Sequence, residues 1–325
     1  MRTVDWVNGA VEIIDQTVLP AQERRLRLSS VDEVVDAIAR LAVRGAPAIG
    51  VAGALGVALA ARSLVDADAL ADAVHRLETA RPTAVNLARG VRLAAAAIPE
   101  GPEAVLAAAL ALRDAEIASA EGMARLGADL ITELCGERPR LLTHCNTGGL
   151  ATVTGGTALG VVAELHRRGR LGGVIASETR PLLQGARLTA WELGRLGIPY
   201  RVAVDGAGPF LMARGEVDAV IVGADRVCAN GDVVNKIGTY AHALGAQAAG
   251  IPFVVVAPES TVDEQTASGA AVPIEDRAAD EVLAWRGVPI APEDADAVNP
   301  AFDVTPNALV TALVTDREVR RAAPR

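Results

Sequence analysis

The sequence predicts an α/β fold with two parts: a mainly helical N-terminal domain and a second domain built on a doubly wound parallel sheet. The first observation behind this prediction is a helical spacing of apolar residues that persists to about residue 138. The second is that short runs of branched residues then alternate with helical segments, as in a parallel sheet covered on both faces. The 325 residues, 51% of them apolar, are enough for two domains. We place these domains at 1–128 and 129–325.

The first domain is predicted to open with a short hairpin and to continue in helices. Alternating apolar residues in 11–20 and 23–30 favour two strands. Residues 46–61 are apolar, rich in Gly and Ala, and fewer than the roughly 20 that a bilayer requires, so we expect a buried helix there. Apolar residues three and four positions apart predict further helices in the segments 31–43, 67–79 and 101–135.

In the second domain five short strand candidates alternate with helical segments. The strand candidates are 140–145, 172–178, 200–206, 217–224 and 251–258. The helical segments between them include 156–169, 182–197 and 235–250. Ligands of such sheets bind outside the carboxyl ends of the strands, so the polar residues that follow each strand are the candidate site. These residues are Thr143, His144, Cys145, Asn146, Glu178, Thr179, Arg180, Gln184, Asp205, Asp225, Arg226, Pro258, Glu259 and Ser260.

Cys145 and Asp225 are the candidates for chemistry. A glycine turn and a predicted helix follow Cys145, and a helix dipole would stabilise its thiolate as a base or nucleophile. The alternative is a small apolar residue that fills space. Asp225 follows the apolar run 217–224, where desolvation would raise its pKa and suit it to proton exchange near neutral pH. The alternative for Asp225 is a pair with Arg226 or a helix cap.

Three other features are weaker signals. The glycine-rich segment 146–156 could bind phosphate through backbone N–H groups, although it lacks the spacing of nucleotide-binding loops. Arg44, which precedes a helix start with Pro47 in its first turn, could form an anion site or could simply be solvated. Lys236 is the single lysine of the chain, which points to a role for a compact ammonium, with a chance surface position as the alternative.

Composition argues against several classes of function. A net charge of −9, without basic runs interleaved with aromatic residues, argues against nucleic acid as a partner. Cys135, Cys145 and Cys228 are widely spaced, which argues against disulfides and a zinc site. For Cys135 and Cys228 we expect a structural role. The N-terminus has no apolar segment before a cleavage site, so we expect a cytoplasmic protein without a membrane partner.

Seven segments carry a resemblance to a known family, and together they cover nearly the whole chain. They are RGAPAIG (44–50), RPTAVNL (81–87), THCNTGGLAT (143–152), ETRPLLQGARLTAWEL (178–193), GADRVCANGDVVNKIGTY (223–240), IPFVVVAPESTVD (251–263) and NPAFDVTP (299–306). The sequence resembles the S-methyl-5-thioribose-1-phosphate isomerases of methionine salvage. The wider family also contains ribose-1,5-bisphosphate isomerases and the regulatory subunits of the eukaryotic initiation factor that exchanges guanine nucleotide.

The resemblance implies a role for each matching residue. The family's catalytic cysteine and aspartate fall on Cys145 and Asp225. Its substrate contacts fall on Arg44, Gly45, Ala46, Arg81, Gln184, Asn235 and Lys236. The resemblance also implies an N-terminal helical domain followed by a Rossmann-like domain, a homodimer, and no cofactor or metal.

The activity implied is that of an aldose–ketose isomerase acting on S-methyl-5-thio-α-D-ribose 1-phosphate. We expect Asp225 to protonate the ring oxygen and Cys145 to act at C2, by a hydride shift or through a cis-phosphoenolate. Segment 204–212 departs from the family pattern, so 5-deoxyribose 1-phosphate and ribose 1,5-bisphosphate stay open as substrates. The remaining alternative is a non-enzymatic regulatory binding protein, which would have little reason to keep the whole set of site residues together.

Overall fold

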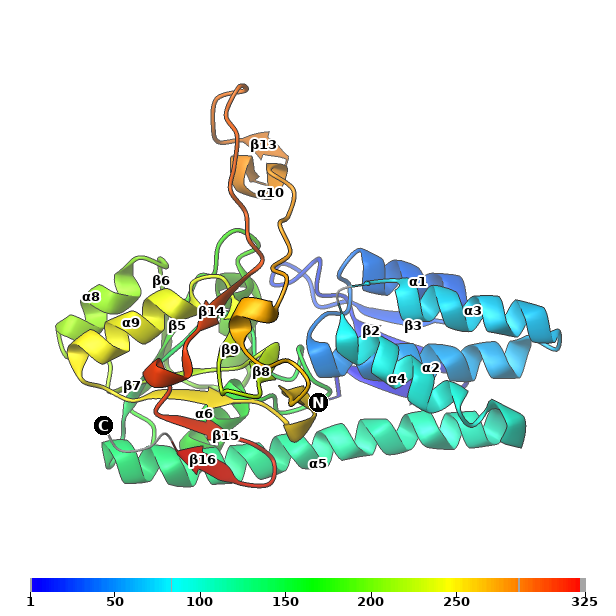
Figure 1. Cartoon of the computed structure of the whole chain (residues 1–325), viewed down its shortest axis with the longest axis horizontal. Coiled ribbons are helices and arrows are strands. Elements are labelled where there is room, and N and C mark those ends of the chain that lie inside the picture. The colour runs from blue at the N-terminus through cyan, green and yellow to red at the C-terminus, as the bar shows by residue number, and fades with distance from the viewer. Residues whose placement is uncertain (1, 83, 286, 322–325) are drawn as a thin grey trace. The chain divides into compact units, whose positions relative to one another are not determined.

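The chain folds as two compact units (Figure 1). The computed structural model describes residues 2–82, 84–285 and 287–321. Unit 1 comprises Met1–Glu121 with Thr147–Gly156, and unit 2 comprises Gly122–Asn146 with Thr157–Arg325. Helix α5 (Pro102–Cys135) contributes residues to both units, and the domain boundary predicted after residue 128 falls inside this helix.

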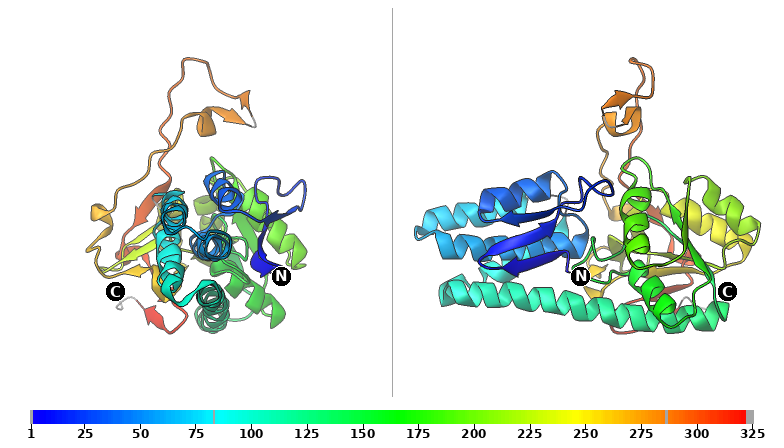
Figure 2. Two further views of the ribbon diagram at one scale, coloured as in Figure 1. Left: turned by 90° about the vertical axis from the view of Figure 1, so that its right-hand side faces the viewer. Right: turned by 180° about the vertical axis from the view of Figure 1, so that it is seen from behind.

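Unit 1 opens with a three-stranded antiparallel sheet, dark blue in Figure 2. Its strands are β1 (Val4–Val7), β2 (Ala10–Ile14) and β3 (Arg25–Leu28). The predicted hairpin is the antiparallel pair β2–β3, while β1 was not predicted. Asn8 and Gly9 join β1 to β2 with φ angles of 48° and 80°, and an Asn-Gly pair is the usual sequence of such a tight turn.

Four helices and the first part of α5 complete unit 1. The helices are α1 (Val31–Ala39), α2 (Ala46–Ser63), α3 (Ala67–Thr79) and α4 (Val85–Ala95), followed by the short helix η1 (Ile98–Glu100). The helices predicted in 31–43, 46–61, 67–79 and 101–135 are confirmed, and α4 was not predicted. Among the residues described, α2 is the one helix long and apolar enough to cross a membrane, but Ala48–Ala60 are all buried in the core.

Glycines let α2 and α4 pack unusually close. A Cβ on Gly90 would lie 2.2 Å from the carbonyl oxygen of Gly50, and one on Gly50 would lie 2.8 Å from the carbonyl oxygen of Asn86. These contacts join the early turns of both helices, so the two helices start at the same end of the pair. Arg44 and Arg81 each precede one of these starts, and the fold therefore brings both to that end of unit 1.

Unit 2 is built on a seven-stranded sheet in the order β16-β15-β10-β7-β4-β5-β6. All neighbours pair in parallel except β16, which runs antiparallel to β15 at the edge. The strands are β4 (Arg140–Thr143), β5 (Gly173–Ser177), β6 (Tyr200–Ala203), β7 (Ala219–Val222), β10 (Phe253–Val256), β15 (Ala312–Val314) and β16 (Val319–Arg321). All five predicted strands are confirmed.

Helices cover both faces of this sheet. Leu141 packs in one core with the last part of α5, α6 (Ala158–Arg167) and α7 (Ala190–Arg195). Its neighbour Leu142 packs in another core with α8 (Ala207–Ala213) and α9 (Thr239–Ala249), because successive side chains of a strand face opposite sides. The predicted α/β class, a helical N-terminal part followed by a parallel-sheet domain, is confirmed.

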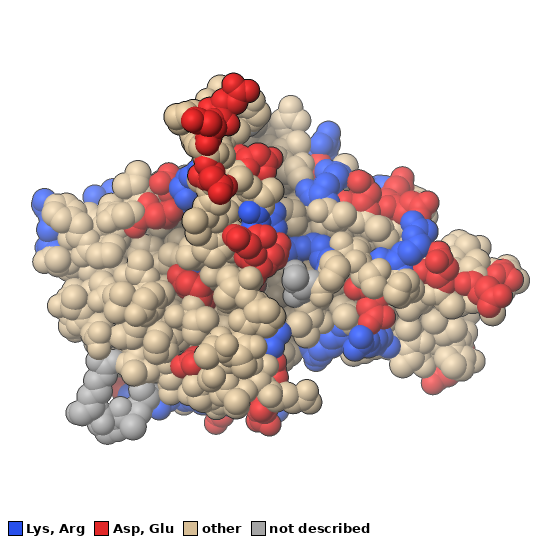
Figure 3. Space-filling model, turned by 45° about the horizontal axis from the view of Figure 1, so that its top comes forward, with Lys and Arg blue, Asp and Glu red and all other residues tan. Residues whose placement is uncertain are grey.

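Smaller elements complete unit 2. A four-stranded sheet has the order β11-β8-β9-β14, with β8 (Arg226–Cys228), β9 (Val233–Lys236), β11 (Val262–Asp263) and β14 (Phe302–Thr305). An arm, residues 276–300, is closed at its base by a bridge between Asp276 and Pro300 and carries acidic side chains at its outer end (Figure 3). It contains α10 (Asp280–Leu283) and the hairpin of β12 (Ala284–Trp285) and β13 (Val288–Pro289). The short helices are η2 (Gly185–Thr189), η3 (Glu259–Thr261), η4 (Gly269–Ala271) and η5 (Asn307–Leu309).

One predicted helix is shorter than expected. Residues 235–250 were assigned to a single helix, but Asn235 and Lys236 end strand β9 and helix α9 begins only at Thr239. The cause is the partner strand β14, which pairs with β9 from the far end of the sequence and extends the backbone through Lys236.

Candidate active site

The polar residues predicted to form a site follow strands whose carboxyl ends lie at one edge of the large sheet. Strands β4, β5, β6, β7 and β10 are neighbours and run parallel, so their carboxyl ends share that edge. Hydrogen bonds then join residues that are far apart in sequence. The Asp205 carboxylate, after β6, accepts from the backbone N–H of Thr179 at 2.8 Å and of Arg180 at 2.7 Å. Thr179 in turn contacts Cys145, after β4.

Cys145 is held through its backbone. Its N–H donates to Thr179 Oγ1 at 2.9 Å, and its carbonyl oxygen accepts from Thr189 Oγ1 at 2.6 Å. Its φ angle is 62°, in the left-handed region that few residues other than glycine adopt. The residue is 9% exposed. The thiol therefore belongs to a rigid, nearly buried turn at the end of β4.

The helix expected directly after Cys145 is absent from that place. Helix α6 begins only at Ala158, and the intervening residues 147–156 belong to unit 1. The prediction that a helix dipole stabilises the Cys145 thiolate was therefore wrong in its structural premise. The glycine-rich segment leads the chain into the other unit and returns it, which a local hydrophobic pattern could not reveal.

Asp225 lies after β7 as predicted, but its surroundings differ from the expectation. Its N–H donates to the carbonyl oxygen of Val234 at 3.0 Å, and the chain continues into strand β8, so the alternative of a helix cap was wrong. Its neighbour Arg226 forms an ion pair of 2.7 Å with Asp263. Asp225 is also exposed rather than buried at the mouth of the strand.

The Asp205 carboxylate is a structural anion at the same sheet edge. Burial would raise its pKa, but hydrogen bonds from Ser177 and from the backbone of Arg180 and Thr179 outweigh this and lower the pKa below its ordinary value. The group therefore stays ionised at neutral pH, and its work is to fix the backbone of residues 179 and 180.

Two buried histidines lie beneath this edge. The rings of His144 and His242 meet edge to face, with centroids 4.9 Å apart. His144 Nε2 lies 2.7 Å from the carbonyl oxygen of Ile237, and His242 Nε2 lies 3.3 Å from Ser177 Oγ. Burial lowers the pKa of both, that of His242 to about 3, so both are neutral at pH 7. The sequence prediction included His144 but missed His242, which the helical pattern of α9 did not distinguish from a packing residue.

Asn235 and Lys236 are fixed by the turn between β9 and α9. Asn235 Nδ2 donates to Thr239 Oγ1 at 2.9 Å, and Thr239 Oγ1 donates to the carbonyl oxygen of Lys236 at 2.6 Å. The Lys236 ammonium donates to the carbonyl oxygen of Ala301 at 2.7 Å and lies 4.2 Å from the centre of the Phe302 ring. The single lysine is therefore partly buried and is held by Ala301 and by Phe302, the first residue of β14.

Asp303, next to Phe302 in β14, was missed by the sequence prediction. Its Oδ2 accepts from the backbone N–H of Gly238 at 2.7 Å and of Tyr240 at 3.1 Å. Burial raises its pKa to about 6, against the lowering effect of these two hydrogen bonds and of Lys236. The motif NPAFDVTP contains this residue, and only the pairing of β14 with β9 shows what it contacts.

Gln184 is buried at the start of the one-turn π-helix η2, directly before Gly185. Gly185 packs so closely on β5 that a Cβ would lie 1.7 Å from the carbonyl oxygen of Ser177. The structure thus places four predicted residues of unit 2, namely Cys145, Gln184, Asn235 and Lys236, in buried or partly buried positions, and leaves Asp225 exposed.

The other predicted contacts, Arg44, Gly45, Ala46 and Arg81, belong to unit 1. Gly45 has a φ of 95°, and a Cβ there would lie 2.3 Å from the carbonyl oxygen of Ala151. That oxygen also accepts from the N–H of Ala48 at 3.3 Å, so the segment RGAPAIG packs directly on the glycine-rich loop 147–156. Two predicted motifs that are distant in sequence therefore form one structure within unit 1.

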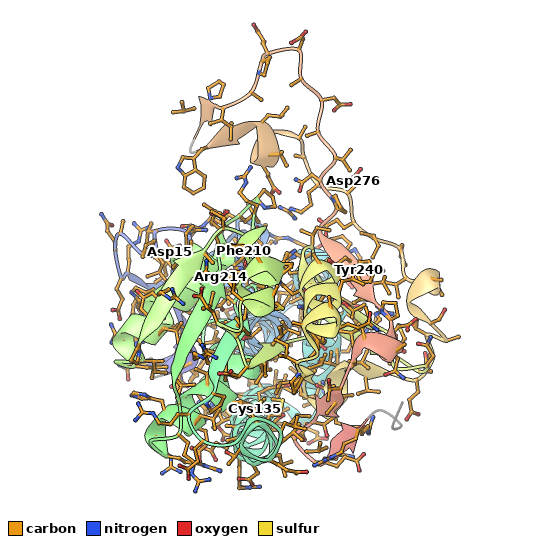
Figure 4. All side chains as sticks on the ribbon, turned by 90° about the vertical axis from the view of Figure 1, so that its left-hand side faces the viewer. Asp15, Cys135, Phe210, Arg214, Tyr240 and Asp276 are labelled. Carbon is orange, nitrogen blue, oxygen red and sulfur yellow. The ribbon has the colours of Figure 1, made fainter. Side chains whose placement is uncertain are left out.

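The remaining thiols lie in structural positions. Burial and the nearby Asp218 raise the pKa of Cys135 to about 11, and burial raises that of Cys228. Figure 4 shows Cys135 on α5, on the other face of the sheet from Phe210 and Tyr240 of α8 and α9. None of the three cysteines forms a disulfide, and residues 2–82, 84–285 and 287–321 contain no cluster of three or more His, Cys, Asp or Glu side chains that could hold a metal ion.

Comparison with known proteins gives consistent matches over nearly the whole chain. The chain is 54% identical to the methylthioribose-1-phosphate isomerase of Anaeromyxobacter dehalogenans, over 98% of this chain and 93% of that protein. It is 52% identical to a probable bifunctional methylthioribose-1-phosphate isomerase/methylthioribulose-1-phosphate dehydratase of Nocardia farcinica, and the match covers 98% of this chain but only 60% of that longer relative.

Solved structures match the chain over nearly its whole length as well. The 5-methylthioribose 1-phosphate isomerase of Pyrococcus horikoshii superposes with a TM-score of 0.91 at 41% identity, covering 98% of this chain and 92% of that one. A chain described as translation initiation factor eIF-2B, subunit delta, from A. fulgidus superposes with a TM-score of 0.88 at 42% identity, covering 98% and 95%. The model of the initiation factor 2 subunit family matches residues 42–319, and the chain therefore belongs to that family.

Proposed function

We propose that this chain is an aldose–ketose isomerase that converts S-methyl-5-thio-α-D-ribose 1-phosphate into S-methyl-5-thio-D-ribulose 1-phosphate in methionine salvage. The observation that carries the proposal is the 54% identity, along almost the full length of both chains, to a relative named as that isomerase. The ordered turn that presents Cys145 at the edge of a parallel sheet supports it, since ligands of such sheets bind at that edge.

The reaction itself explains why an acid and a second group are needed. Phosphate esterifies the anomeric oxygen of the substrate, so the ring cannot open to a free aldehyde. Opening requires a proton on the ring oxygen as the bond from that oxygen to C1 breaks. One hydrogen must then move from C2 to C1, and the C2 hydroxyl must lose its proton as the ketone forms. Every atom of the substrate is retained, so the step is an isomerisation without an external oxidant.

In our proposal Asp225 supplies the proton to the ring oxygen and Cys145 acts at C2. Asp225 is exposed, and in this proposal the bound substrate adds the desolvation that favours its protonated form. The phosphate and hydroxyl groups are assigned to Arg44, Gly45, Ala46, Arg81, Gln184, Asn235 and Lys236. Guanidinium and ammonium groups are the usual ligands of a phosphate, and backbone N–H groups at the start of α2 suit the same anion.

A panel of three sugars tests the proposal by proton NMR. The purified protein is incubated with S-methyl-5-thioribose 1-phosphate, 5-deoxyribose 1-phosphate or ribose 1,5-bisphosphate. We expect the methylthio sugar to give its ketose phosphate fastest. Faster turnover of either other sugar would reassign the substrate, and no turnover of any would support a regulatory binding protein. In deuterated water, solvent label at C1 of the product would exclude a direct hydride shift.

We further propose that the chain acts as a homodimer in the cytoplasm. The support is the family resemblance alone, so the state has to be measured. Light scattering on the eluate of a sizing column should give twice the mass of 33.4 kDa computed for one chain. A mass of one chain, or of four, would contradict the dimer.

A further inference from the structure

We propose that the hydroxyls of Thr179 and Thr189 form a clamp that positions the Cys145 thiol for catalysis. This inference rests on the proposed isomerase function, and it assigns a role to two residues that the sequence prediction did not place among the substrate contacts. The clamp closes on both sides of one residue. Thr179 Oγ1 accepts from the Cys145 N–H at 2.9 Å, and Thr189 Oγ1 donates to the Cys145 carbonyl oxygen at 2.6 Å.

The backbone held by the clamp is strained. Cys145 has a φ of 62° and Thr179 a φ of 66°, and a β-branched residue in this region is a rare outlier. Two such residues joined by one hydrogen bond persist only where the surroundings dictate their conformation, and strain of this kind gathers at functional sites. Turns whose only purpose was to end β4 and β5 could use glycine at these two positions without this cost.

The direction of the Thr179 hydroxyl is determined by its neighbours. It donates its one proton to the carbonyl oxygen of Ser177 at 3.0 Å, so only its lone pairs remain to accept the Cys145 N–H. The Asp205 carboxylate accepts from the backbone N–H of Thr179 and of Arg180 and holds the strained residue in place. The side chain of Thr179 is fully buried, so water does not compete for these bonds.

The second half of the clamp comes from the π-helix η2. Its first residue, Gly185, touches the carbonyl oxygen of Ser177, and its last residue, Thr189, is fully buried against Cys145. Thr189 Oγ1 also lies 3.3 Å from Asn146 Nδ2, which donates to Glu192 Oε1 at 2.8 Å. Single-turn π-helices inside longer helices occur often at functional sites. Here Thr189, the last residue of the π-helix, supplies the hydroxyl that donates to the Cys145 carbonyl oxygen.

The consequence of the clamp is a fixed direction for the Cys145 side chain. The peptide groups on both sides of the residue are hydrogen-bonded, and this fixes the direction of its Cα–Cβ bond. A displacement of about 1 Å at a reacting group costs about 100-fold in rate. Loss of either hydroxyl should therefore lower the rate of chemistry far more than the affinity for the sugar phosphate.

Threonine-to-valine substitutions test this directly, because valine keeps the shape and loses only the hydroxyl. For Thr179→Val and Thr189→Val we expect kcat to fall by about 10- to 100-fold and KM to change by less than about 3-fold. Thr179→Ser and Thr189→Ser keep the hydroxyl and should restore kcat to within about 3-fold of the natural protein. The matched control is Thr305→Val, because Thr305 is fully buried in the same unit and its hydroxyl has no hydrogen-bond partner among the described residues.

A second readout does not depend on the isomerase activity. The rate at which iodoacetamide modifies each cysteine is followed by mass spectrometry between pH 6 and pH 10. Both valine variants should change the pH profile of Cys145, while Cys135 and Cys228 should keep theirs. If the natural protein does not isomerise any sugar, the proposed function fails, and the alkylation profiles still decide whether the clamp exists.

Three results would overturn the clamp. The first is a pair of folded valine variants with the kcat and the Cys145 alkylation profile of the natural protein. The second is an equal loss of kcat in the Thr305→Val control. The third covers the case in which the valine variants do not fold: a loss of kcat of about 10-fold or more in a folded serine variant would show that the hydroxyl is not what matters.

Discussion

Gly185→Ala should damage both the stability and the activity of the protein. The new Cβ would lie 1.7 Å from the carbonyl oxygen of Ser177, 2.9 Å from its carbonyl carbon and 3.0 Å from Thr179 Oγ1. Carbon and oxygen atoms in ordinary contact are roughly 3.4 Å apart, so about 1.7 Å of movement is needed. The obstructing atom belongs to the backbone at the end of β5 and cannot rotate away. We therefore expect the upper end of the usual cost of overpacking, about 3 kcal/mol or more.

Activity should fall as well, because η2 has to move and it carries Thr189. Urea unfolding, followed by circular dichroism, should show a midpoint lower by about 1 M, and kcat should fall by about 10-fold or more. Gly194→Ala is the matched control in the adjoining helix α7. Its Cβ would meet only the Tyr200 ring, at 3.7 Å from the hydroxyl, so the usual gain of about 0.5 to 1 kcal/mol for alanine in a helix is expected. Equal stability of Gly185→Ala and the natural protein would refute the reasoning.

Three further predictions concern titratable side chains in buried or partly buried positions. The pKa of Asp303 is raised from 3.8 to about 6, so the stability that its protonated form contributes below pH 4 is lost as the pH rises to 6. The Asp303→Asn variant cannot ionise at this position, so it does not lose this stability. The difference in unfolding free energy, variant minus natural protein, should rise by about 3 kcal/mol between pH 4 and pH 7 in urea titrations. The pKa of His242 is lowered from 6.5 to about 3, so its contribution is present above pH 6.5 and is lost as the pH falls. His242→Gln should therefore gain about 3 kcal/mol relative to the natural protein between pH 7 and pH 4, and a flat difference would contradict the assignment of a neutral buried ring. Lys236→Arg should raise KM by about 10-fold with little change in the unfolding midpoint. The planar guanidinium of arginine cannot replace the compact ammonium, which is held by the carbonyl oxygen of Ala301 and the ring of Phe302. An unchanged KM in steady-state kinetics would remove Lys236 from the phosphate contacts.

Local patterns predicted the strands of unit 2 well. Four of the five predicted strands, β4, β5, β7 and β10, are short and mostly buried apolar runs bounded by turn residues, which is the pattern that a parallel sheet covered on both faces requires, whereas β6 is an exposed strand at the edge of the sheet. The rule that ligands bind at the carboxyl ends of such strands then pointed to Cys145, Thr179 and Asp205, which the structure joins by hydrogen bonds. The physical constraint was strong because burial on both faces leaves only the strand ends for polar groups.

Long-range pairing explains what local patterns missed. Lys236 was assigned to a helix because its neighbours are helical in spacing, yet β14 pairs with β9 from about 65 residues away and keeps it extended. Asp303 became visible only through that same pairing. The path of residues 147–156 into unit 1 also has no local signal, and it removed the helix expected after Cys145.

The most direct test of the central claim is the turnover of S-methyl-5-thioribose 1-phosphate by the natural protein beside Cys145→Ser. Serine keeps the size of the side chain and the turn bonded by Thr179 and Thr189, but it removes the thiol. The proposal predicts ketose phosphate in the first reaction and a loss of at least about 1,000-fold in kcat in the second, with the same unfolding midpoint. Turnover by Cys145→Ser at the rate of the natural protein would contradict the account.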